Sequence, residues 1–343
     1  MKTLALFASL IAVPLFTFAQ TLQERVDVDI VLVDATVTDA RGNQILGLGP
    51  DDFVVRENGV EQKIESVDYF TNRRLLTSPE KDAAFKVERV REERYFVLFF
   101  DESGGSPAMG RLIRAQKDAV AFVRDLKPED RVAVASYDAR LNIHADFTSD
   151  EKILTKALDD VIKFTKGLTE VPSYAGEASI LRAIDVDEMV DGTGRIYDAL
   201  EVLGNALRPI QARKVVAFFS PGIGDASSLS SDIPEMEETL FRPMARALNA
   251  ANVTVHAIAL IPEASFSPIE QNLSRFASET GGEFYTNVVN FKTPLKKLER
   301  ESSGYYLLSY RAPKHEGGHG YQKIEVRLRN PEFRIRARDG YLY

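Results

Sequence analysis

The sequence predicts an α/β protein in which a doubly wound, mostly parallel sheet is combined with a small β-sandwich. Between residues 94 and 303, short apolar runs alternate with amphipathic helical patterns, as they do when parallel strands are connected by helices. On either side of this stretch, apolar and polar residues alternate, which is typical of strands that bury one face. Neither flanking segment has enough strands to close a core alone. We therefore expect the two to pair, with the α/β part inserted between them.

The composition narrows the possible functions. The chain has 343 residues, a formal net charge of −8 and no cysteine. The absence of thiols excludes disulfides, thiolate zinc sites and cysteine nucleophiles. The acidic balance argues against nucleic acid or an anionic membrane as the main partner, because binding phosphates requires an excess of Lys and Arg.

Residues 1–19 have the pattern of a secretory signal peptide. An apolar run extends from Leu4 to Phe18, and the small residues Thr17 and Ala19 stand at its end. We expect cleavage after Ala19, a secreted or periplasmic protein, and no membrane span once the peptide is removed. An uncleaved anchor is the alternative, although the run is short for a bilayer span of about 20 residues.

Residues 20–72 are expected to form an N-terminal β segment. Its alternating runs are separated by turn signals, of which Asn58-Gly59 is typical of a two-residue hairpin. Residues 73–93 are dense in charge and lack sustained periodicity. We interpret them as a charged linker with a helical turn around residues 83–90.

The stretch from 94 to 303 should contain the elements of the α/β part. Buried strands are expected where short apolar runs occur, at residues 95–100, 131–137, 214–219 and 253–261. Helices are expected at residues 109–126, 149–164, 195–207, 234–251, 270–280 and 294–301. We also expect an edge strand at 141–147, a short strand at 282–286 and an irregular insertion at 166–191.

Residues 304–343 are expected to form a C-terminal β segment. Three alternating strands are predicted, at residues 305–310, 321–328 and 333–341. These should pair with the strands of residues 20–72. In the last of them Arg334, Arg336 and Arg338 share one face, which we interpret as a solvated edge, with an acidic partner as the alternative.

A group of oxygen-bearing side chains follows the first buried strand of the α/β part. Asp101, Ser103 and Ser106 stand where that strand gives way to a helix. Open α/β sheets bind ligands in the crevice outside the carboxyl ends of their strands. The sequence therefore predicts a binding site at this edge of the sheet.

Three landmarks of the α/β part resemble those of a von Willebrand factor type A domain. They are Asp-Glu-Ser at 101–103, Gly-Thr-Gly at 192–194 and KVVAFFS followed by Pro-Gly at 214–222. The flanking segments are similar, more specifically, to exported bacterial proteins described as having a type-A-related domain, which are seen often in acidobacteria. The resemblance covers most of the mature chain and implies a Rossmann-like fold.

The resemblance also implies a site for Mg²⁺ or Mn²⁺. In that family an Asp-x-Ser-x-Ser loop, a threonine from a second loop and an aspartate from a third bind the ion, and a carboxylate of the partner protein completes the octahedron. Asp101, Ser103 and Thr193 match the corresponding positions. Oxygen ligands in octahedral geometry are what Mg²⁺ prefers.

Two positions depart from the family's pattern. The second serine is not matched, because Ser106 comes one residue late. Pro221 stands in the place of the third-loop aspartate, so Asp225 is the expected substitute and Glu102 a weaker one. Three interpretations therefore stay open: a degenerate metal site, a metal-free face for protein contacts, or a structural role for Asp101 at the start of the helix.

The sequence does not favour an enzyme. Ser106, Ser136 and Ser220 lie near strand ends without a Gly-x-Ser-x-Gly elbow, and His144 and His256 are embedded in strand patterns, so we expect no base beside a serine. We expect a non-enzymatic module that binds a protein, through an acidic side chain of that partner, and no nucleic acid. The alternatives are a scaffold that uses its β-sandwich and a hydrolase acting on cell-surface polymer.

Overall fold

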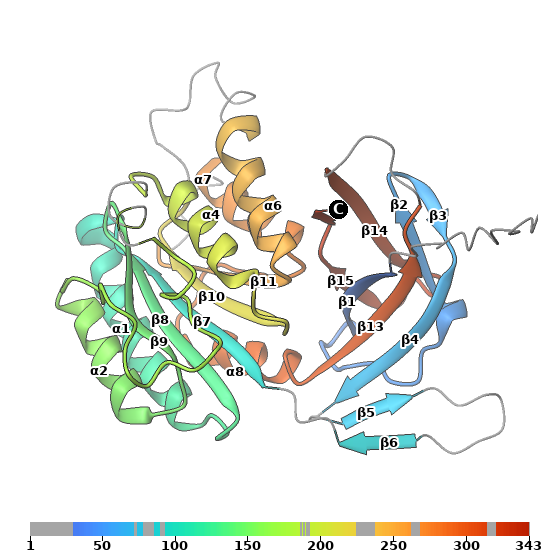
Figure 1. The fold of residues 1–343 in the computed structure, drawn as a ribbon, viewed down its shortest axis with the longest axis horizontal. Coiled ribbons are helices and arrows are strands. Elements are labelled where there is room, and N and C mark those ends of the chain that lie inside the picture. The colour runs from blue at the N-terminus through green and yellow to red at the C-terminus, as the bar shows by residue number, and fades with distance from the viewer. Residues whose placement is uncertain are drawn as a thin grey trace, which may run out of the picture.

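The computed structural model describes residues 30–71, 74–77, 86–89, 93–185, 187, 189, 193–223, 237–261, 268–313 and 320–342. The predicted signal peptide at residues 1–19 lies outside these ranges. Within them, no helix has both the length and the apolar character needed to cross a membrane. The described chain forms an α/β half and a β-sandwich half, which lie side by side (Figure 1).

The α/β half is built on a six-stranded sheet with the order β12-β11-β10-β7-β8-β9. Its strands are β7 (Arg94–Asp101), β8 (Asp130–Tyr137), β9 (Leu141–Thr148), β10 (Lys214–Ser220), β11 (Val253–Ala259) and β12 (Phe284–Tyr285). All neighbours are parallel except β8 and β9. In chain order this is a 3-2-1-4-5-6 arrangement, as in doubly wound folds. The predicted fold class is confirmed, including the antiparallel edge strand.

Helices cover both faces of this sheet. One face packs on α1 (Gly105–Arg124), α2 (Glu151–Ile162) and α8 (Lys292–Glu301). The other face packs on α4 (Ile196–Leu207), α6 (Arg242–Ala250) and α7 (Pro268–Glu279), and a π-helical turn (Glu237–Phe241) precedes α6. Alternate residues of β7 therefore enter two separate cores, which explains why its run of apolar residues is uninterrupted.

The β-sandwich combines strands from both ends of the described chain. One sheet has the order β15-β1-β13-β4-β5-β6 and the other β16-β14-β2-β3. Strands from the N-terminal side are β1 (Ile30–Thr38), β2 (Phe53–Glu57), which follows a 3₁₀ turn (Pro50–Asp52), β3 (Val60–Gln62), β4 (Ile64–Thr71), β5 (Arg74–Thr77) and β6 (Lys86–Arg89). From the C-terminal side come β13 (Gly304–Arg311), β14 (Tyr321–Leu328), β15 (Arg334–Ala337) and β16 (Gly340–Leu342). The predicted pairing of the two segments, with the α/β part inserted between them, is confirmed.

Three local predictions about these strands can be compared with the structure. The hairpin at Asn58-Gly59 connects β2 to β3, and both of its residues have positive φ, 49° and 85°. The expected linker at 73–93 instead contains β5 and β6, which extend the larger sheet. The single strand expected at 333–341 is divided into β15 and β16, which belong to different sheets.

Two of the three arginines that share a face, Arg336 and Arg338, are bonded within the chain, whereas Arg334 is exposed. Arg336 donates to Glu283 at 2.7 Å and to Glu301 at 2.5 Å, so it joins β15 to the end of α8. Arg338 donates to backbone carbonyls of Asn249 and Leu32. The interpretation as a solvated edge is therefore wrong for these two arginines, because their guanidinium groups donate hydrogen bonds to carboxylates and carbonyls of the same chain.

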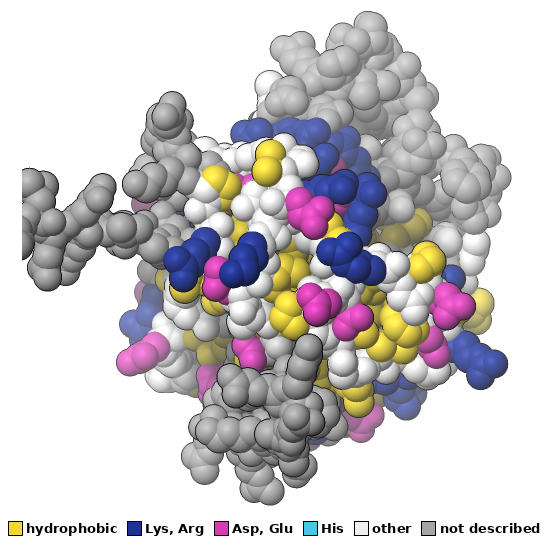
Figure 2. Space-filling view, turned by 90° about the vertical axis from the view of Figure 1, so that its right-hand side faces the viewer, with side chains coloured by type: hydrophobic (Ala, Val, Ile, Leu, Met, Phe, Trp, Pro, Cys, Tyr) yellow, Lys and Arg dark blue, Asp and Glu magenta, His cyan; other side chains and the backbone are white. Residues whose placement is uncertain are grey.

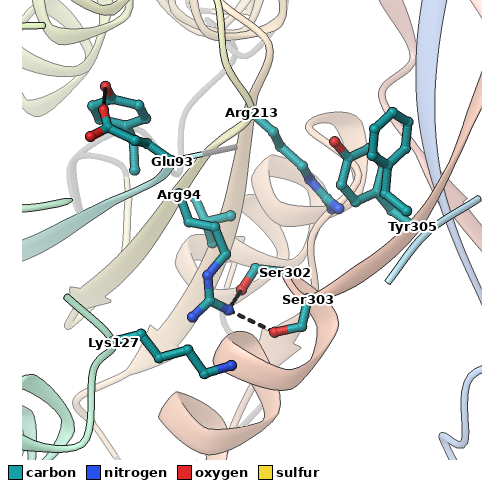
Figure 3. A pocket seen from close by; sticks show the side chains of 10 residues that line it. Glu93, Arg94, Lys127, Arg213, Ser302, Ser303 and Tyr305 are labelled. Carbon is teal, nitrogen blue, oxygen red and sulfur yellow. Dashed lines mark hydrogen bonds between the residues drawn. The ribbon is translucent and has the colours of Figure 1, made fainter. Parts of the chain in front are cut away.

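A second group of contacts joins the halves beside a small pocket of about 30 Å³. Arg94, at the start of β7, pairs with Asp130 at 2.7 Å and donates to the hydroxyls of Ser302 and Ser303 after α8 (Figure 3). Arg213 lies over the ring of Tyr305 at 4.9 Å.

At the far end of the sandwich, hydrophobic side chains lie among charged ones on the surface (Figure 2).

Candidate metal centre

The ends of β7 and β10 bring Asp101 and Ser220 into contact. The two strands are neighbours whose connections run in opposite directions, so the crevice of a doubly wound sheet lies between them. Phe100 pairs with Phe219 in the parallel register, and their rings stack with centroids 4.8 Å apart. One residue further on, the Ser220 hydroxyl donates to Asp101 Oδ2 at 2.7 Å.

The other oxygen of Asp101 is bonded within its own loop. Oδ1 accepts from the Ser103 backbone N–H at 3.0 Å and from the Ser103 hydroxyl at 2.5 Å. Asp101 is only 1% exposed, and burial raises the pKa of its carboxyl group, although the hydrogen bonds from Ser103 and Ser220 oppose that rise. Among the described residues, no Lys or Arg forms an ion pair with Asp101. A cation would therefore stabilise the ionised carboxylate.

Thr193 lies at the same edge of the sheet, but its hydrogen bonds connect it to the hairpin between β8 and β9. Its hydroxyl donates to the Met189 carbonyl at 2.6 Å and accepts from the Leu141 N–H at 2.8 Å. Tyr137, the β8 residue that pairs with Asp101, donates its hydroxyl to the Gly194 carbonyl. Since a hydroxyl has two lone pairs, one lone pair of Thr193 remains free for a ligand.

Two other predicted ligands stay predictions. Ser106 lies in the first turn of α1, where its backbone is described and its side chain is not. Asp225 lies outside the described residues. Ser220 was not predicted as a ligand, although a hydroxyl directly after the KVVAFF run was a signal that this strand ends in an oxygen.

The loops after β7 and β10 pack directly against each other. A Cβ atom added at Gly104 would lie 2.7 Å from the Cβ atoms of both Pro221 and Ala108, which is closer than real atoms approach. Pro221, which stands where the resemblance predicted an aspartate, fills this contact with its ring. The glycine therefore allows the approach that places Ser220 beside Asp101.

A serine and a histidine meet beneath this edge. The Ser136 hydroxyl and His144 Nε2 are 2.8 Å apart, so the expectation that no base stands beside a serine is wrong for Ser136. Both residues are buried, with exposed fractions of 1% and 8%, and burial lowers the pKa of His144 to about 4. A nucleophilic hydroxyl must reach a substrate, and this one is covered by the protein.

Glu102 adds a second carboxyl group close to the site. Burial raises its pKa to about 7, a hydrogen bond from Ser136 opposes the rise, and the charges of Asp138 and Asp101 add to it. Its Oε1 atom is buried and has no hydrogen-bond partner in the described part of the chain. A cation bound nearby would oppose this rise, because positive charge favours the ionised carboxylate.

The oxygens present suit a hard cation better than zinc. In the described ranges, no group of three or more His, Asp and Glu side chains is placed to hold a metal ion. What the strand ends provide is the Asp101 carboxylate with the hydroxyls of Ser103 and Ser220. Mg²⁺ is typically bound by one or two carboxylates while it keeps several waters.

The strand order and the site together define a class: a doubly wound α/β protein with a carboxylate and two hydroxyls at the switch point of its sheet. No protein-family model and no curated protein matches the chain. Among solved structures, the chain is similar to von Willebrand factor type A proteins.

One such structure is the von Willebrand factor type A protein from Catenulispora acidiphila, at 9% identity and a TM-score of 0.42, covering 85% of this chain and 74% of that one. The von Willebrand domain of the type V pilus tip protein Mfa5 from Porphyromonas gingivalis gives 12% identity, a TM-score of 0.40 and coverages of 62% and 94%. BatB from Bacteroides thetaiotaomicron has 11% identity and a TM-score of 0.39, and the match covers 61% of this chain and 98% of that one. Likeness at this level does not say what the chain binds.

Proposed function

We propose that the protein is an exported, non-enzymatic binding module of the von Willebrand type A kind, which holds a divalent cation and through it a partner protein. The observation that carries the proposal is the environment of Asp101, a buried carboxylate surrounded by hydroxyl and amide donors at the switch point of the sheet. Export is proposed from the pattern of residues 1–19.

Asp101, Ser103 and Ser220 are the residues that would hold the ion. Mg²⁺ or Mn²⁺ supplies positive charge to a carboxylate that burial has removed from water. With one carboxylate and two neutral hydroxyls, the occupied site would keep a net positive charge. It would therefore attract an acidic side chain of the partner protein, which is the kind of ligand we propose.

Calorimetric titration of Mn²⁺ and Mg²⁺ tests the metal centre. We expect heat of binding with the wild type, none with Asp101→Ala, and at least about fivefold weaker binding with Ser220→Ala, because the cation loses one of its few protein ligands. Ser278→Ala is the matched control, since the Ser278 hydroxyl donates to the Arg275 carbonyl within α7 and has no hydrogen bond to Asp101. The absence of heat with the wild type would remove the metal from the proposal.

A metal-free binding face is the second candidate, and one observation favours it. Both oxygens of Asp101 already accept hydrogen bonds without an ion. If this candidate is correct, neither Mn²⁺ nor a chelator will change the melting temperature of the protein. A rise in melting temperature with Mn²⁺ that the chelator reverses would exclude the metal-free face, because a ligand that binds only the folded state stabilises that state.

A further inference from the structure

We propose that the groove between α1 and α8 is a second docking surface, which binds an acidic amphipathic helix of a partner protein. The groove has a volume of about 590 Å³. It is lined by the C-terminal part of α1, by α8 and, at one end, by Gln44 of the sandwich half. This proposal does not depend on the metal centre.

The groove lies far from Asp101. Asp101 precedes the first residue of α1, whereas the groove follows residues 118–127 at the other end of this 20-residue helix. At 1.5 Å per residue, the two are separated by about 25 Å along the helix axis. A partner helix in the groove would therefore leave the crevice at β7 and β10 open.

The floor of the groove is apolar. It is lined by Ala121 and Phe122 from α1, by Leu126 just after this helix, and by Leu295 from α8. Phe122 and Leu295 belong to the core beneath, while Ala121 and Leu126 are only partly buried. The floor can accept an apolar side chain. A partner helix can pack in the groove between α1 and α8 at the usual interaxial distance of about 8–10 Å.

One rim of the groove carries regularly spaced positive charges. Lys292, Lys296 and Arg300 follow one another every fourth residue along α8, and all three are exposed. Four residues of helix correspond to about 6 Å, so these charges form a straight row. Lys127 adds another exposed cation at the end of α1. Within the described residues, none of these four side chains has a hydrogen bond or an ion pair.

The lining also contains three acidic residues, two of which are engaged outside the row. The Asp118 carboxylate accepts from the Phe291 N–H at 3.0 Å, and Glu299 lies 3.7 Å from Arg94. Asp125 is the remaining acid in the lining. The four basic residues of the lining thus outnumber its acidic residues by one, and three of them form one rim, although the whole chain carries −8. Such a local potential favours a partner of opposite sign.

The occupant that fits both features is a helix with acidic residues at i, i+4 and i+8 and apolar residues beside them. Its acids match the spacing of the α8 row, and its apolar residues enter the floor, as in other helix-in-groove complexes. A polyanion such as a sulfated polysaccharide would use the charges but not the floor. The experiment must separate these two.

The probe is a fluorescein-labelled helical peptide with Glu at i, i+4 and i+8 and Leu at i+3 and i+7, measured by fluorescence anisotropy. We expect the combined variant Lys292→Gln, Lys296→Gln, Arg300→Gln to bind it about tenfold more weakly, since three exposed charge pairs are lost and each contributes only modestly. The matched control neutralises three exposed lysines at α2, through Lys152→Gln, Lys163→Gln and Lys166→Gln. It should bind as the wild type does.

A second variant and two further probes decide between the occupants. Ala121→Trp fills the floor without changing charge and should also abolish peptide binding, while a peptide with Lys in place of Glu should not bind. The proposal is overturned if the α8 variant binds as the wild type does, or if both peptides bind equally. It is also overturned if heparin displaces the peptide and Ala121→Trp still binds it, because the site would then recognise charge alone.

Discussion

Asp101 and His144 are both buried, and burial shifts their pKa values in opposite directions because in each case it disfavours the charged form. For Asp101 the neighbours are hydroxyls, which allow a cation to take their place as the stabilising partner. For His144 the neighbour is the Ser136 hydroxyl, which is satisfied by a neutral imidazole. The first residue is therefore suited to binding an ion, and the second to packing.

The neutral state of His144 gives a prediction about pH. Its pKa is lowered to about 4 from 6.5, so between these values the unfolded chain binds more protons than the folded one. The free energy of unfolding must therefore fall as the pH falls through this window. Between about pH 6.5 and pH 5 we expect His144 to contribute up to about 2 kcal/mol of that loss.

Urea unfolding of the wild type and of His144→Gln at both pH values measures this contribution. The variant should lose less stability than the wild type on acidification. His256 is also buried with a lowered pKa, but it is present in both proteins and cancels in the difference. Equal losses in the two proteins would show that His144 does not titrate as described.

The residues of the site were only partly predictable from the sequence. Asp101 and Ser103 follow an apolar strand and are visible as a local pattern. The contact of Ser220 with Asp101 depends on the register of two strands that are 119 residues apart in sequence. The contact of Ser136 with His144 depends on the irregular register between β8 and β9. Local periodicity carries no information about either register.

At the scale of elements, the close packing of the two loops at the site is the feature with the sharpest consequence. Gly104→Ala would place a methyl group 2.7 Å from Pro221 and Ala108 and force the loops apart. We expect a loss of about 1–3 kcal/mol in the free energy of unfolding. We also expect weaker Mn²⁺ binding, because Ser220 would move away from Asp101.

Gly110→Ala is the natural control for that variant. Gly110 lies in α1, and beyond the adjoining turns of that helix nothing in the described chain lies within 4 Å of the position that its Cβ would occupy. Alanine favours a helix over glycine by about 1 kcal/mol, so this variant should be slightly more stable than the wild type. Thermal melts and calorimetry of both variants check the pair. A stable Gly104→Ala protein with unchanged ion binding would contradict the role given to this contact.

The elements of the α/β half could be predicted because long apolar runs and helical periodicity are local signals. The strands β5 and β6 could not, because they are four residues each, carry charge, and owe their conformation to pairing with β4. The start of α1 was expected at residue 109 and lies at Gly105. Pro107 therefore falls in the first turn of this helix, where proline is tolerated.

At the scale of the whole molecule, the two halves are connected by buried charge. Arg336→Met would leave Glu301, whose side chain is 3% exposed, with only Lys297 at 3.9 Å. Removing one partner of a buried pair typically costs about 3–5 kcal/mol. We expect a loss of that order in urea unfolding.

Two further variants make this test specific. Arg334→Met removes an exposed arginine from the same strand and should change stability by less than about 0.5 kcal/mol. Adding Glu301→Gln to Arg336→Met removes the unpaired buried carboxylate and should recover part of the lost free energy of unfolding. If Arg336→Met, Arg334→Met and the double variant all unfold as the wild type does, the contact between β15 and α8 does not stabilise the molecule.

The place of β13 between β1 and β4 determines when the sandwich can form. The strands before residue 72 have no central partner until the chain beyond residue 304 is present, and contacts such as Gln44 with Gly304 span 260 residues. Proteins dominated by such distant pairings fold slowly, and until they fold their unpaired strand edges can pair with other chains and aggregate. The α/β half, whose neighbouring strands follow each other more closely in sequence, would be complete first. The sandwich would then close over it as the last and rate-limiting event of folding.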